Sequence, residues 1–60
     1  MPLPNDPLLL MSVVNTKLRD FYPTLDALCD DLNENRAALE AKLAAIGYVY
    51  DEAGNRFVRR

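Results

Sequence analysis

The chain has 60 residues and a formal net charge of −2, with 50 % hydrophobic and 27 % charged residues, which indicates a packed core rather than a disordered tail. A chain of this length makes a single domain that buries only about 60 % of the surface its unfolded form exposes, so we expect its stability to be small. It contains one cysteine and no histidine, which excludes an internal disulfide and leaves no metal-ligand cluster and no nucleophile–base pair.

A helix over residues 6–22 is the first regular element expected, and two prolines make residues 1–5 an extended arm before it. Asp6 is a good N-cap, because its carboxylate can accept the free N–H groups of the first turn. Pro7 suits the first helical position, where its missing N–H is not needed. Pro23 ends the helix.

One face of this first helix is apolar and is predicted to enter the core. The residues on that face are Leu10, Met11, Val14, Leu18, Phe21 and Tyr22. Leu9 and Val13 lie outside it, so they are candidates for a protein interface. The apolar run 8–14 is too short to span a membrane and lacks a basic leader, and with a single free cysteine it favours a cytoplasmic protein.

A short amphipathic helix is expected over residues 24–33, with Thr24 as its N-cap. Its apolar stripe has helical spacing and consists of Leu25, Leu28, Cys29 and Leu32. Cys29 therefore reads as a buried small hydrophobic residue rather than a reactive thiolate. The outer face is acidic, and we interpret it as a solvated surface rather than a cation or acid–base site; its residues are Asp26, Asp30, Asp31 and Glu34.

A third helix is expected over residues 35–46, ended by Gly47, after a turn in which Asn33 or Asn35 provides the cap. Its core stripe consists of Leu39, Leu43 and Ile46. The side away from that stripe carries Ala37, Ala38, Ala41, Ala44 and Ala45. An alanine face lets another helix approach closely, although alanine is also simply a strong helix former.

A two-stranded hairpin is expected over residues 48–58, because apolar and other residues alternate on both sides of a turn in which Gly54 can adopt a positive φ. Such a ribbon is marginal alone, so it needs anchoring side chains on the core. The expected anchors are Tyr48, Tyr50 and Phe57. The terminal residues Arg59 and Arg60 are expected to fray.

The order of a short helix, a turn, an alanine- and leucine-rich helix and a hairpin resembles the C-terminal part of a winged helix-turn-helix, with the first helix completing a three-helix core. The fold class expected is thus mainly α: a three-helix, winged helix-turn-helix-like domain with a C-terminal two-stranded β-hairpin. One departure is Glu34, a carboxylate where such a turn usually buries an apolar residue. Either Glu34 is exposed, or the turn differs from the usual one.

Several sequence blocks also resemble a small bacterial family, the domain of unknown function 4250. These blocks are residues 3–7, 17–22 and 46–48, with Tyr50 and Asp51, and together they span nearly the whole chain. The resemblance implies no activity, ligand or catalytic residue.

Two binding functions remain open, and we expect no enzyme activity, no cofactor, no metal and no small-molecule substrate. The first is a protein-interaction or self-association module, whose partner is another protein or a second copy of this chain in a homodimer. The candidate interface residues are Leu9, Val13, Ala37, Ala41 and Ala45. The alternative is DNA binding through the third helix and the hairpin, with candidate contacts Asn35, Arg36, Lys42, Arg56 and Arg59. The negative net charge, the acidic second helix and the alanine face disfavour nucleic acid.

Overall fold

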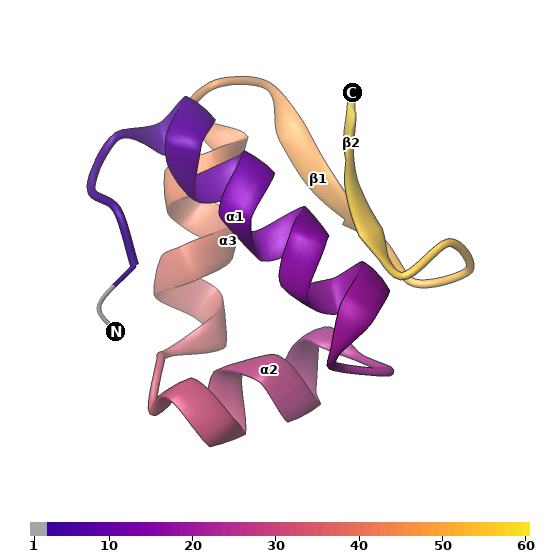
Figure 1. The fold of residues 1–60 in the computed structure, drawn as a ribbon. Coiled ribbons are helices and arrows are strands. Elements are labelled where there is room, and N and C mark those ends of the chain that lie inside the picture. The colour runs from indigo at the N-terminus through magenta and orange to yellow at the C-terminus, as the bar shows by residue number, and fades with distance from the viewer. Residues whose placement is uncertain (1–2) are drawn as a thin grey trace.

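Three helices precede a two-stranded antiparallel hairpin in residues 3–60, the part of the chain that the computed structural model describes (Figure 1). The elements are α1 (Pro7–Asp20), α2 (Leu25–Leu32), α3 (Arg36–Ala44), β1 (Tyr48–Asp51) and β2 (Arg56–Arg59). The predicted combination of three helices and a C-terminal hairpin is confirmed. Met1 and Pro2 of the predicted arm lie outside the described residues.

Each helix begins at a polar side chain that satisfies free N–H groups of the first turn. Asp6 Oδ1 accepts from the N–H groups of Leu8 and Leu9 at 2.9 and 3.3 Å. Thr24 Oγ1 accepts from the Ala27 N–H at 3.0 Å. The cap of α3 is Asn35, whose Oδ1 accepts from the Ala38 N–H at 3.0 Å.

The first helix ends two residues before the predicted boundary, and this changes the fate of Phe21. Phe21 is the C-cap of α1 and has left the helix, with φ −126°. The helix ends here because Pro23 disfavours helical backbone at the next residue, Tyr22. Its side chain is 71 % exposed, so its predicted place in the core is wrong. Tyr22 packs partly against the core as predicted.

The hairpin also differs from expectation at both of its ends. The turn places its positive φ at Asn55 (51°) and not at Gly54, because asparagine also tolerates the left-handed conformation. At the open end Arg59 pairs with Tyr48, and the Arg60 N–H donates to the Gly47 carbonyl at 2.8 Å. The expected fraying of these two arginines is therefore not what the structure shows. Gly47 itself follows α3 with φ +85°, a conformation that favours glycine.

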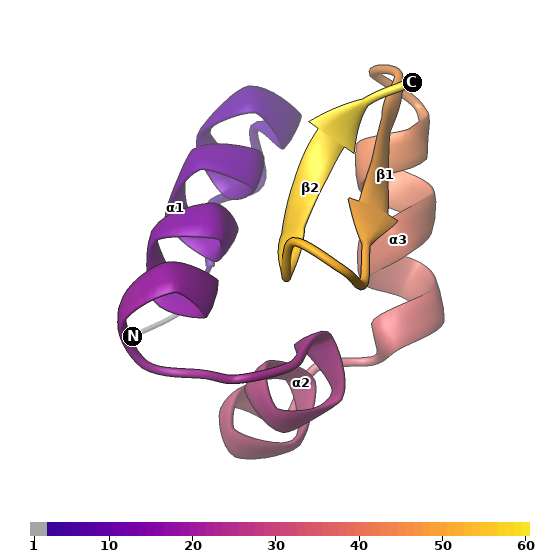
Figure 2. The same ribbon diagram turned by 90° about the vertical axis from the view of Figure 1, so that its right-hand side faces the viewer.

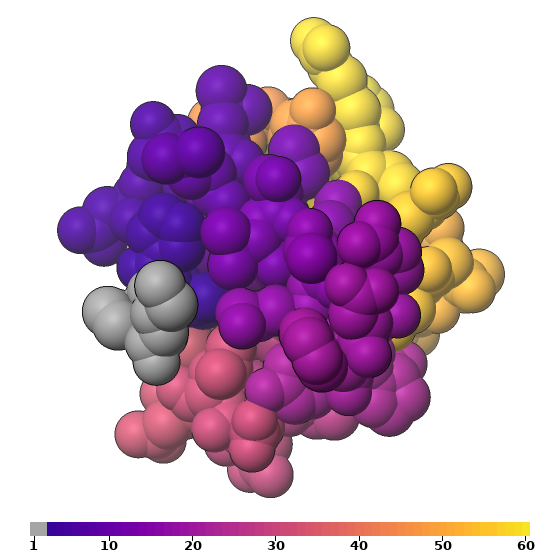
Figure 3. All heavy atoms as spheres, viewed as in Figure 1, coloured from indigo at the N-terminus to yellow at the C-terminus, as the bar shows by residue number. Residues whose placement is uncertain are grey.

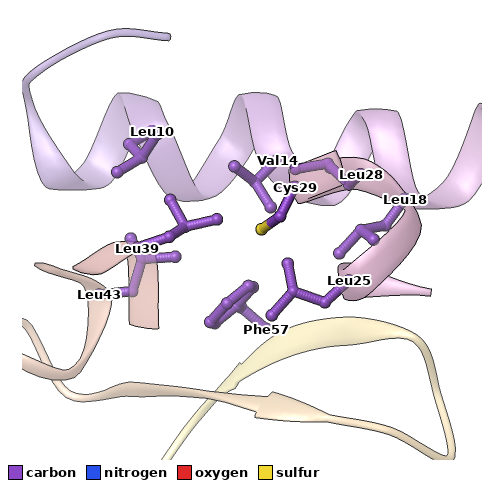
Figure 4. Packing of buried hydrophobic residues seen from close by; sticks show 9 residues of the cluster. All are labelled: Leu10, Val14, Leu18, Leu25, Leu28, Cys29, Leu39, Leu43 and Phe57. Atoms are coloured by element: carbon purple, nitrogen blue, oxygen red, sulfur yellow. The ribbon is translucent and has the colours of Figure 1, made fainter. Parts of the chain in front are cut away.

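Side chains from all three helices and from β2 form one apolar core (Figure 4). Phe57 points from β2 into this cluster and is only 3 % exposed, which confirms it as an anchor of the hairpin. The buried residues are Leu10, Val14, Leu18, Leu25, Leu28, Cys29, Leu39, Leu43 and Phe57. Tyr48 and Tyr50 pack against the edge of the cluster, as does Leu3 from the arm.

The side-chain amide of Asn15 joins α1 to the outer edge of β2. Its Oδ1 accepts from the Phe57 N–H at 2.7 Å, and its Nδ2 donates to the Phe57 carbonyl at 3.1 Å. The amide thus forms the two hydrogen bonds that a neighbouring strand would form. It satisfies the backbone of Phe57 on the side turned away from β1.

A second amide, that of Asn55, holds the hairpin turn against the junction of α1 and α2. Its Nδ2 donates to the carbonyls of Leu18 and Tyr22 at 3.1 and 2.9 Å, which are free because α1 ends there. Its Oδ1 accepts from the Tyr50 hydroxyl at 2.6 Å, and that hydroxyl accepts from the Leu25 N–H at 3.1 Å. One connected polar network therefore links both helices to the hairpin.

We expect replacement of Asn15 by alanine to destabilise the fold by about 2–3 kcal/mol, because it leaves two half-buried backbone groups of Phe57 without partners. The free energy of unfolding is measured by urea denaturation followed by circular dichroism. Ser12→Ala, at an exposed position of the same helix, is the matched control and should change it by less than about 0.5 kcal/mol. Equal effects of the two substitutions would contradict the role of Asn15.

Candidate functional site

The alanine face predicted on the third helix is exposed. In α3, Leu39 and Leu43 are buried, and the helix turns its opposite side to solvent. The exposed residues there include the three candidates Ala37, Ala41 and Ala45. This face offers methyl groups but no hydrogen-bond donors from its side chains.

The candidates on the first helix lie on the surface to different degrees. Leu9 is 59 % exposed and Val13 is half-buried. The neighbouring Leu8 is also 59 % exposed, and it was not among the predicted interface residues. We call Leu8, Leu9 and Val13 the α1 patch. In Figure 3 the atoms of α1 fill the centre of the view, and the other described elements lie around its margins.

The α1 patch and the alanine face do not form one surface. Helices α1 and α3 contact each other, and each contributes buried residues such as Val14 and Leu43 to the shared core, so their outer faces point away from each other. Figure 2 shows the two helices at opposite sides of the molecule, with the hairpin between them. A partner that covers one of these faces leaves the other free.

Arg36, the leading candidate for a DNA contact, is surrounded by carboxylates. Its Nη1 lies 2.9 Å from Asp26 Oδ1, its Nε 3.4 Å from Glu40 Oε2 and its Nη2 3.6 Å from Glu52 Oε1. Its guanidinium carbon also lies 5.3 Å from the centre of the Tyr50 ring. The hydrogen bond with Asp26 is the main cause that raises the pKa of Arg36 above its ordinary value. The charge of this arginine is thus balanced within the domain.

The other candidate DNA contacts are dispersed. Asn35 uses its side-chain oxygen as the cap of α3, and Lys42 lines a small hollow of about 140 Å³ between α3 and the arm. Arg56 and Arg59 are exposed at the two ends of β2. The five residues therefore do not form one continuous basic surface.

The acidic residues of α2 and its following turn are exposed, as predicted. Glu34 is among them, which decides between the two alternatives for this position in favour of exposure. Asp26 pairs with Arg36, and Asp31 accepts a hydrogen bond from the Tyr22 hydroxyl, which raises the pKa of Tyr22. Within residues 3–60 no group of three or more aspartate, glutamate, cysteine or histidine side chains is placed to hold a metal ion.

Cys29 is buried as predicted, with 5 % of its surface exposed. Burial raises the pKa of its thiol, since the thiolate would lose its hydration in the core. None of the helices in the described part of the chain has the length and apolar character needed to cross a bilayer.

A groove between α1 and the hairpin turn is a feature that sequence reasoning missed. It has a volume of about 670 Å³, and Arg19 from α1 and Arg56 from the hairpin line it together with Ser12 and Thr16. Ser12, Asn15, Thr16 and Arg19 recur at spacings of three and four residues, which places them on one side of a helix. This polar strip on α1 could have been recognised from the sequence, but the packing of the hairpin turn beside it could not.

Comparison with known proteins agrees with the resemblance seen in the sequence. A family model described as Domain of unknown function (DUF4250) matches residues 4–57, which include all three helices, β1 and the start of β2. No curated protein and no solved structure matches the chain.

We expect Arg36→Ala to lower the free energy of unfolding by about 1–2 kcal/mol, because the substitution removes the group that balances three carboxylates and packs on Tyr50. The loss stays small because Asp26 and Glu52 are largely exposed and exposed ion pairs contribute only about 0–1 kcal/mol each. Lys42→Ala on the same helix is the control and should have almost no effect. The measurement is urea unfolding at low and high salt, and an Arg36→Ala loss that does not shrink with salt would contradict an electrostatic contribution.

We expect Cys29 to react with a disulfide reagent at least about a hundredfold more slowly in the folded chain than in urea at about pH 8, because the buried thiol stays protonated. The unfolded thiol loses its proton first as the pH rises, so this residue lowers the stability only above about pH 8.5. The absorbance of the thiolate that the reagent releases on reaction measures the rate in the folded chain and in urea. Similar rates in the two states would mean that Cys29 is accessible.

Proposed function

The chain belongs to the DUF4250 family, and we propose that it is a non-catalytic interaction module that associates with a second copy of itself through the α1 patch. The observation that carries the proposal is the exposure of two adjacent leucines. Leu8 and Leu9 are each 59 % exposed, on a helix whose other leucines are buried.

The charge pattern of α1 supports a second copy as the partner. The sequence from Pro7 to Thr16 contains no charged residue, although 27 % of the whole chain is charged. Two copies of this surface can therefore meet around a twofold axis without bringing like charges together. The burial of each exposed leucine contributes up to about 1.5–3 kcal/mol to association.

The size of the domain supports the same partner. The core of residues 3–60 is a single cluster built from short elements, and domains this small gain stability from oligomerisation. The alanine face of α3 is the second candidate surface, but methyl groups alone bury less apolar area than leucine side chains. A closed twofold dimer uses one of these two opposite faces, and we assign the α1 patch.

The alternative function, DNA binding through α3, draws less support from the geometry. The guanidinium of Arg36 faces three carboxylates, and the face of α3 opposite the core carries alanines, with Lys42 as the one further basic residue of the helix. Base recognition needs side-chain donors and acceptors at that position, and phosphate binding needs cations that are not already neutralised.

We expect the chain to be a dimer at high micromolar concentration, and we expect Leu9→Glu to raise the dimer dissociation constant by about a hundredfold or more without unfolding the domain, because it places a charge in an apolar interface. Sedimentation equilibrium measures the mass, and circular dichroism checks the fold. Ala41→Glu is the matched control, since it places the same charge on the opposite helix face.

The two variants separate the possible outcomes. Dissociation by Leu9→Glu with an intact Ala41→Glu dimer supports the α1 patch. Dissociation by Ala41→Glu alone would assign the interface to α3 and contradict the proposed surface. A monomeric chain at high micromolar concentration would contradict self-association itself.

A further inference from the structure

The groove between α1 and the hairpin turn has the form of a small-molecule site. Its volume of about 670 Å³ falls within the range of about 300–1,000 Å³ that is common for such sites. One wall comes from α1, and the other from the end of the hairpin turn and Arg56, the first residue of β2. In Figure 1 the hairpin turn lies beside the C-terminal half of α1. Both walls are held together by the amides of Asn15 and Asn55, so the groove is formed before any ligand enters.

Two guanidinium groups on opposite walls give the groove its chemical character. Arg19 comes from α1 and Arg56 from the hairpin, and none of the other residues that line the groove is charged. The hydroxyl of Ser12 adds a polar group on the α1 side, whereas Met11 is a half-buried apolar group. The groove therefore combines positive charge with an apolar part.

Both arginines keep donors for a ligand. Arg19 donates two hydrogen bonds to its neighbour Asp20, at 2.9 and 3.1 Å, but the two side chains are 74 % and 42 % exposed, and such a pair is weak in water. Arg56 forms no ion pair within residues 3–60, although the carboxylate of Asp51, its cross-strand partner, lies beside Gly54 as the guanidinium of Arg56 does. A guanidinium carries five N–H donors, so neither group is exhausted by these neighbours.

Strand β2 contributes further positive charge beside the groove, since it carries two arginines, is followed by Arg60 and contains no acidic residue. Carboxylates also lie in the hairpin: Asp51 is the cross-strand partner of Arg56, and Glu52 pairs with Arg36 of α3. The attraction of an anion to the groove therefore depends on the two arginines that line it and not on the overall charge of the domain.

We propose that this groove binds an organic phosphate monoester. A tetrahedral phosphate presents oxygen acceptors in several directions and can accept from Arg19 and Arg56 on opposite walls, whereas one planar carboxylate is matched by a single arginine. The organic part lies along α1 near Met11. The proposal does not rest on self-association, and the groove adjoins the α1 patch, because Ser12 lies one helical turn from Leu8 and Leu9.

The test is a titration of the full-length ¹⁵N-labelled chain with phenyl phosphate, followed by backbone amide and arginine Nε–Hε resonances at constant ionic strength. We expect saturable shifts centred on Ser12, Arg19 and the turn around Gly54, with a dissociation constant on the order of millimolar. Phenyl phosphate should bind at least about threefold more tightly than inorganic phosphate, because its ring buries apolar surface in the groove.

Three variants distinguish a built site from general attraction of anions. Arg19→Gln and Arg56→Gln should each weaken phenyl phosphate binding by about fivefold or more, because each removes a charged donor from the groove. Arg59→Gln removes the same charge from the far end of β2 and should change the affinity by less than about twofold. The spectrum of each free variant checks that the fold is retained.

Three results would overturn the proposal. The first is the absence of saturable shifts at tens of millimolar phenyl phosphate. The second is an equal loss of affinity in Arg59→Gln and the two groove variants, which would show attraction by net charge alone. The third is equal affinity for inorganic phosphate, which would leave no role for an organic group.

Discussion

The domain depends on the attachment of its hairpin to α1, and the side-chain amide of Asn15 makes that attachment. A two-stranded ribbon is at best marginally stable alone in water, and the core of this domain includes a side chain from the ribbon as well as those of the three helices. Phe57 is the residue of β2 that completes the cluster, and Asn15 binds both of its outward backbone groups at 2.7 and 3.1 Å. Phe57 is thus held in two ways: its own side chain packs in the core, and its backbone N–H and carbonyl bind the amide of Asn15.

The two arginines Arg36 and Arg56 differ in how many carboxylates surround them. Arg36 is drawn to Asp26, Glu40 and Glu52, which removes the most plausible nucleic-acid contact from the surface of α3. Arg56, in contrast, reaches the groove beside α1, because Asn55 holds the turn against the end of that helix. Two arginines that are equivalent in the sequence therefore differ in how free they are to bind a ligand. This difference disfavours DNA binding through Arg36 and supports phosphate binding through Arg56.

Much of the fold could be predicted because it is determined by residues close to one another in the chain. The caps Asp6, Thr24 and Asn35 and the apolar stripes of the helices were readable from spacing, as was the anchoring role of Phe57. Phe21 was misplaced because a periodic pattern continues past the residue at which the helix ends. The candidate surfaces were harder to predict. The exposure of Leu9 follows from its place outside the apolar stripe of the first helix, but the sequence does not show that the core lies between α1 and α3 and places their two apolar faces on opposite sides.

The three helices, the hairpin and their order follow from local sequence, since capping, proline and glycine positions and apolar periodicity act within a few residues. The hydrogen-bond partners of the polar side chains depend instead on how the elements pack. Asn15 binds a residue 42 positions away, and Asn55 binds carbonyls 37 and 33 positions away, so neither choice is visible in local spacing. Such partners depend on how the elements pack, and that packing also decided which leucines remain exposed and which arginines meet across a groove.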